Sequence, residues 1–114
     1  MKIASIYQDL EYNEKKPAIT VLFETSFTKE IRIVMKAGQI MKEHKTSFPI
    51  VVEIVGGKLD FGVKGNTHHL KKGNLVALQG GVPHDLKAIE NSIIRLTLTK
   101  YDESNRVKNV VKND

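Results

Sequence analysis

Short apolar segments separated by turn residues fill most of this sequence, and they constrain the fold more than any other feature. Six runs rich in valine, isoleucine and phenylalanine occupy residues 18–24, 29–36, 50–55, 58–63, 74–79 and 92–99. Several of them alternate polar and apolar side chains, which is the period of a strand with one buried face. Turn segments separate the runs and contain glycine in every case except residues 25–28, and no stretch has the apolar period of an amphipathic helix. The pattern predicts an all-β protein, an antiparallel sandwich or barrel.

A chain of 114 residues is expected to form a single domain, residues 1–114. We expect its core within residues 18–100 and a flexible, frayed tail at residues 101–114, where apolar anchors are few. No apolar run approaches the roughly 20 residues that span a bilayer, and the first residues lack the pattern of a signal peptide. The absence of cysteine excludes disulfides and thiolate metal sites. We therefore expect a cytoplasmic protein with no membrane partner.

The net charge of +5 comes mainly from lysine. Of the 18 basic residues, 15 are lysines scattered over predicted loop ends and turns, whereas specific phosphate recognition favours the planar arginine fork. Aromatic residues interleaved with basic ones, which single-strand binders use to stack bases, are also missing. We expect a solvated lysine-rich surface and no nucleic-acid partner.

Two short motifs stand out by the spacing of their glycine and histidine residues. Their anchors are Gly38, His44 and Gly57 in the first motif and Gly73, Gly81 and His84 in the second. This spacing resembles the two motifs of the cupin superfamily, and the resemblance covers residues 30–99. It implies a cupin-type jelly-roll β-barrel, also called a double-stranded β-helix.

The resemblance also implies a homodimer, as in many small cupins. A physical reason supports it, because a short sandwich leaves unpaired edge strands that a two-fold dimer hides. We expect a strand near residues 2–7 and the run at residues 18–24 to cross between the two copies.

The departures from the family motifs concern chemistry. Family metal sites use three histidines and one glutamate, but Thr46 stands in the place of the second histidine and Ile50 in that of the glutamate. In the second motif, Gln79 replaces a proline and Ala88 an asparagine. A divalent transition metal such as zinc, iron, manganese or nickel would thus have two of the four family ligands, His44 and His84.

Such a metal site is incomplete by ordinary coordination chemistry, because a stable mononuclear centre normally has at least three protein ligands. Neighbouring carboxylates do not fill the gap. Glu43 and Asp85 adjoin the two histidines and therefore point to the opposite face of their strands. Alternation from position 50 also turns Glu53 outward.

Three roles for the two histidines stay open. We favour a small cupin that binds a small polar or anionic molecule at the barrel mouth, and the residues expected to contact this ligand are His44, Thr46, Ile50, Gln79 and His84. The alternative is a metal-dependent enzyme, an oxygenase or isomerase, that uses a two-histidine site. In the third role the histidines only line a partly solvated mouth. The sequence assigns no catalytic residue and no substrate, and leaves open whether the protein is an enzyme.

Overall fold

The structure is a computed structural model that describes residues 1–100, and the expected flexible tail at residues 101–114 lies outside the described residues. The described part contains nine strands: β1 (Ala18–Glu24), β2 (Thr28–Met35), β3 (Ile40–His44), β4 (Ile50–Gly56), β5 (Lys58–Val63), β6 (Asn66–Lys71), β7 (Leu75–Leu78), β8 (His84–Ala88) and β9 (Ser92–Thr99). Within residues 1–100 there is no helix, and hence none that is long and apolar enough to cross a membrane. The predicted all-β class is confirmed.

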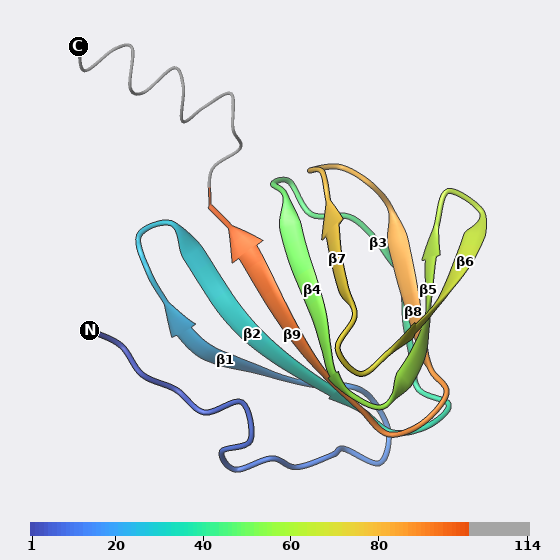
Figure 1. Cartoon of the computed structure of the whole chain (residues 1–114), viewed down its shortest axis with the longest axis horizontal. Coiled ribbons are helices and arrows are strands. Elements are labelled where there is room, and N and C mark those ends of the chain that lie inside the picture. The colour runs from blue at the N-terminus through green and yellow to red at the C-terminus, as the bar shows by residue number, and fades with distance from the viewer. Residues whose placement is uncertain (101–114) are drawn as a thin grey trace.

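The strands form two antiparallel sheets that face each other (Figure 1). One sheet has five strands in the order β1-β2-β9-β4-β7, and the other has four in the order β3-β8-β5-β6. Strands far apart in the chain are therefore neighbours, since β9 lies between β2 and β4, and β8 lies between β3 and β5. This crossing between two layers is the jelly-roll arrangement that the resemblance implied.

The core fills the space between the two sheets because the strands alternate their side chains. In β4, Ile50, Val52 and Ile54 are buried, and in β5 Leu59 and Phe61 are buried. They pack with further apolar side chains from β2, β8 and β9, chiefly Ile31, Ile33, Met35, Leu86, Ala88 and Ile94. Burial of such side chains at about 25 cal/mol per Å² is the main term that offsets the entropy of ordering the chain.

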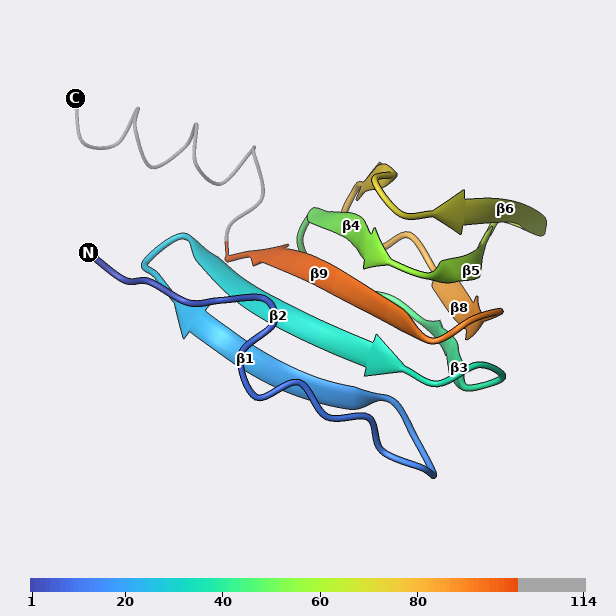
Figure 2. The ribbon, with the colours of Figure 1, turned by 60° about the horizontal axis from the view of Figure 1, so that its bottom comes forward.

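Strand β2 is buried on both faces, because the N-terminal segment covers its outer face. All residues from Ile31 to Met35 are buried, and Figure 2 shows the N-terminal segment crossing β1 and β2. The prediction of a strand near residues 2–7 is wrong, since no strand occurs there. The physical reason is that the carbonyls of Ile6 and Gln8 accept hydrogen bonds from the Arg32 side chain rather than from a neighbouring strand.

Two turns show why glycine is needed where it occurs. Lys64 and Gly65 connect β5 to β6 with φ values of 52° and 78°, and two successive positive values are typical of the type I′ hairpin turn. Between β4 and β5, Gly57 has a φ of 87°, and a Cβ at this position would lie 2.3 Å from the carbonyl oxygen of Asn91. Only glycine fits there without a shift of the backbone.

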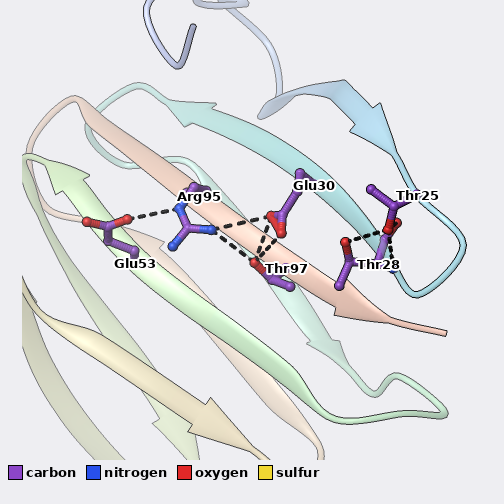
Figure 3. Close-up of polar contacts among 6 residues, drawn as sticks. All are labelled: Thr25, Thr28, Glu30, Glu53, Arg95 and Thr97. Carbon is purple, nitrogen blue, oxygen red and sulfur yellow. Dashed lines mark hydrogen bonds and ion pairs between the residues drawn. The ribbon is translucent and has the colours of Figure 1, made fainter. Parts of the chain in front are cut away.

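The outer face of the five-stranded sheet carries a polar network centred on Arg95 of β9 (Figure 3). Its Nε donates to Glu53 of β4 at 2.9 Å, and its Nη1 donates to Glu30 of β2 at 3.3 Å. The hydroxyl of Thr97 donates to the Glu30 carboxylate at 2.7 Å. The network ties three adjacent strands together and confirms that Glu53 points outward, away from the barrel interior.

Candidate functional site

His44 and His84 lie directly opposite each other on the paired strands β3 and β8. Directly opposed residues of an antiparallel pair share one face, and the two ring centroids are 4.3 Å apart with the planes inclined at 60°. Strict alternation would put Met41 and His44 on opposite faces of β3. The pairing shifts by one residue between them, a β-bulge, so that both side chains face the interior.

Backbone carbonyls fix the orientation of both imidazole rings. The Nδ1 of His44 lies 2.8 Å from the carbonyl oxygen of Lys42, and the Nδ1 of His84 lies 3.0 Å from that of Val82. A carbonyl oxygen only accepts hydrogen bonds, so each Nδ1 must carry a hydrogen. In the neutral rings, Nε2 is then the unprotonated nitrogen and offers a lone pair.

The two histidines differ in depth. His84 is 4% exposed, and the ring of Phe61 stacks on it with a centroid distance of 5.6 Å and an interplanar angle of 6°. His44 is exposed. The Nε2 of His84 has no hydrogen-bond partner within residues 1–100, yet among the described side chains only Arg32 Nε is both fully shielded and without a partner. A water or a ligand atom can therefore reach the His84 nitrogen.

A small cavity of about 30 Å³ lies beneath the two rings. Apart from the histidines, apolar side chains line it, namely Ile33, Met41, Val52, Phe61, Leu86, Ile94 and Leu96. About one water molecule fits such a volume. The site thus combines two nitrogen acceptors with apolar walls and with an open side at His44.

The other residues expected at the site do not line this cavity. The hydroxyl of Thr46 donates to the carbonyl of Phe48 at 3.0 Å, in the loop before β4. Ile50 begins β4 and packs in the core, where it is 2% exposed. Gln79 is exposed in the loop after β7. The structure therefore brings His44 and His84 together and places the remaining three residues elsewhere.

Carboxylates do not complete the histidine pair. Glu43 and Asp85 line a hollow on the outer face of the four-stranded sheet, and Glu53 binds Arg95 on the outer face of the other sheet. Within residues 1–100, no three of the residue types His, Asp and Glu gather as a metal centre would need. The residues present thus do not fit a mononuclear site with three protein ligands.

Phe61 and Met41 line the cavity with the histidines, and the sequence analysis named neither of them as a site residue. Strand alternation carried a signal for Phe61, because it is inward together with Leu59 on β5. Met41 had no such signal, since its inward direction beside His44 depends on the bulge.

Two facing antiparallel sheets with crossed connections define the class of double-stranded β-helix proteins. No protein-family model matches the sequence, and a search of curated proteins finds no sequence match.

Solved structures with this fold are similar over most of the chain. An RmlC-like cupin protein from Desulfovibrio desulfuricans has a TM-score of 0.80 at 17% identity, over 87% of this chain and 96% of that one. An uncharacterised protein with a double-stranded β-helix domain from Klebsiella pneumoniae has a TM-score of 0.79 at 18% identity, over 87% and 90%. KdgF from Halomonas has 0.74 at 13%, over 92% and 99%. The described part of the chain has the fold of the small cupins, and at these identities the likeness concerns the fold alone.

Proposed function

We propose that this protein is a small-molecule-binding cupin that recognises its ligand through His44 and His84. The observation that carries the proposal is that both Nδ1 atoms donate to backbone carbonyls, which leaves both Nε2 atoms as acceptors above an apolar cavity. Two adjacent acceptors suit a molecule with hydroxyl or amine hydrogens. When one ring takes up a proton, the pair suits an anion instead.

The volume of the cavity limits how such a ligand binds. About 30 Å³ admits little more than a water, so most of the ligand lies over the exposed side of His44. Met41 lines the cavity, and its flexible thioether chain can move to admit an apolar group. Thr46 and Gln79 contact only a ligand that extends onto the loops before β4 and after β7.

A metal-dependent enzyme is the second candidate, and one observation favours it. Metal-bound histidines commonly donate their other ring nitrogen to a carbonyl or carboxylate, as His44 and His84 do. The missing third ligand opposes it, because zinc, iron, manganese or nickel would be held weakly by two imidazoles and water. No catalytic residue is assigned.

Ligand-observed NMR with a library of small hydroxylated and carboxylated compounds tests the binding proposal. We expect at least one compound to bind the wild-type protein and to shift the ring resonances of His44 and His84. The substitution His44→Ala should abolish this binding, whereas His68→Ala, an exposed histidine outside the cavity, should leave it unchanged. Binding that persists in His44→Ala, or a library without hits, would overturn the proposal.

Elemental analysis of untagged protein separates the two candidates. After extensive dialysis against a chelator, we expect less than stoichiometric transition metal. A metal retained at one per chain would promote the enzyme over the metal-free binding protein. The cytoplasmic location and the lack of a nucleic-acid partner stay predictions.

A further inference from the structure

Arg32 is a buried cation on the outer face of β2, remote in the fold from the histidine pair. The residue is 3% exposed, although arginine normally reaches water. Its Nη1 donates to the carbonyls of Ile6 at 3.0 Å and Gln8 at 2.6 Å, and its Nη2 makes a long contact of 3.4 Å to that of Asp9. No carboxylate within residues 1–100 forms an ion pair with it. The charge is thus held by backbone dipoles alone.

The neighbouring arginine shows what Arg32 lacks. Arg95 lies directly opposite Arg32 on β9, on the same face of the sheet. It binds Glu30 and Glu53, the two carboxylates of this face that form its ion pairs (Figure 3). Arg32 therefore faces a like charge across the ladder without an anion of its own. A buried charge without an opposite charge is costly, and an anion would compensate it.

One edge of the Arg32 guanidinium has unused hydrogen-bonding capacity. Nε is shielded from solvent and has no acceptor within the described part of the chain. Nη2, on the same edge, has only the long contact to the Asp9 carbonyl. The two N–H groups of this edge form the planar fork that binds both oxygens of a carboxylate or phosphate in parallel.

A hollow of about 390 Å³ adjoins this arginine beneath the N-terminal segment. Its polar lining consists of Arg32, Ser5, Gln8, Asp9 and Thr20. Within residues 1–100 the side chains of Gln8 and Thr20 make no hydrogen bond, so an amide and a hydroxyl are available as donors there. The Asp9 carboxylate is the one negative group of this lining.

We propose that the hollow is a binding site for a small oxyanion, a compound with a carboxylate or phosphate group that the Nε–Nη2 edge of Arg32 takes up. Thr20 and Gln8 donate further hydrogen bonds to the anion. Because Nε is shielded, the segment around Asp9 shifts outward when the anion enters. The site is independent of the histidine pair, since it lies on the outer face of the five-stranded sheet.

The test is a titration of ¹⁵N-labelled full-length protein with inorganic phosphate and, separately, with acetate, at constant ionic strength set by sodium chloride. We expect saturable shifts of the Thr20 and Gln8 amides and of the Arg32 Nε–H signal. The anion that binds with the higher affinity shows whether the site prefers phosphate or carboxylate. Non-saturable shifts, or shifts spread evenly over the surface, would contradict a built site.

Three variants locate the anion. Asp9→Asn removes the competing carboxylate and should tighten binding about threefold to tenfold, whereas Thr20→Val should weaken it by a similar factor. Arg32→Lys keeps the charge without the fork and should abolish binding if it folds. Thr67→Val, on the other sheet, is the control and should change nothing. Weaker binding in Asp9→Asn would show that Asp9 itself serves Arg32, and the proposal would fail.

Discussion

Gly57 is the residue whose replacement should disturb the fold most directly. The substitution Gly57→Ala forces a positive φ on alanine and brings its Cβ to 2.3 Å from the Asn91 carbonyl. We expect the free energy of unfolding to fall by about 2–4 kcal/mol, measured by urea denaturation.

Gly65→Ala is the matched control for this effect. Gly65 also has a positive φ, 78°, but no atom lies within 4 Å of a Cβ added there. Its substitution should cost only about 1 kcal/mol, from the backbone conformation alone. If both variants lose the same free energy of unfolding, the close contact with the Asn91 carbonyl does not contribute to the cost of Gly57→Ala.

At the residue scale, the resemblance to the cupin motifs pointed to His44 and His84 as the two retained family ligands, and their rings do converge. The side chains around the two rings could not be predicted from the sequence. The bulge in β3 that turns Met41 inward with His44 depends on pairing with β8, which a residue count does not reveal. The binding role of the pair stays a prediction.

The two ion pairs of Arg95 should contribute unequally to the stability of the five-stranded sheet, the pair with Glu30 more than the pair with Glu53. The Glu30 side chain is 15% exposed and also accepts a hydrogen bond from Thr97, whereas the Glu53 side chain is 34% exposed and binds only Arg95. We expect Glu30→Gln to cost about 1–2 kcal/mol of unfolding free energy and Glu53→Gln less than about 1 kcal/mol, by thermal and chemical denaturation. The cost of Glu53→Gln should shrink further in high salt, and a larger cost than that of Glu30→Gln would refute this ranking.

A strand could be predicted from the sequence where apolar side chains recur along it. Apolar alternation gave β1, β5 and β9 with the bounds that the structure has, and β2, β4 and β7 within a residue. Strands β3, β6 and β8 were not among the apolar runs. In "IMKEH" the exposed Ile40 is apolar and Met41 is the one apolar side chain that lines the interior, and in "HDLKA" the buried residues are His84, Leu86 and Ala88. So few apolar inward residues do not mark a strand, and its existence depends on tertiary pairing.

At the scale of the whole molecule, β1 presents an uncovered inner face. Ile19 pairs with Ile33 and so shares the face that elsewhere forms the core, yet Ile19 is 58% exposed and Val21 is 49% exposed. The edge of β1 is also unpaired within residues 1–100. Both features suit a second copy of the chain.

We therefore predict a homodimer formed through β1, visible in sedimentation equilibrium at micromolar concentration as a species of about twice the chain mass. Ile19→Lys should shift it to monomer, because a lysine would be buried in the interface. Ile89→Lys replaces another exposed isoleucine, 49% exposed and away from β1, and should keep the dimer. A wild-type monomer at high concentration would refute the prediction.

The difference in depth between the paired imidazoles has a consequence for covalent chemistry. Of the four histidines, His44, His68 and His69 are exposed, whereas His84 lies behind His44 and against Phe61. An acylating reagent such as diethyl pyrocarbonate should therefore modify three histidines quickly and His84 slowly, which mass spectrometry of peptides resolves over time. Removal of the His44 ring should open the path and accelerate the acylation of His84, so that one imidazole sets the reactivity of the other by shielding it.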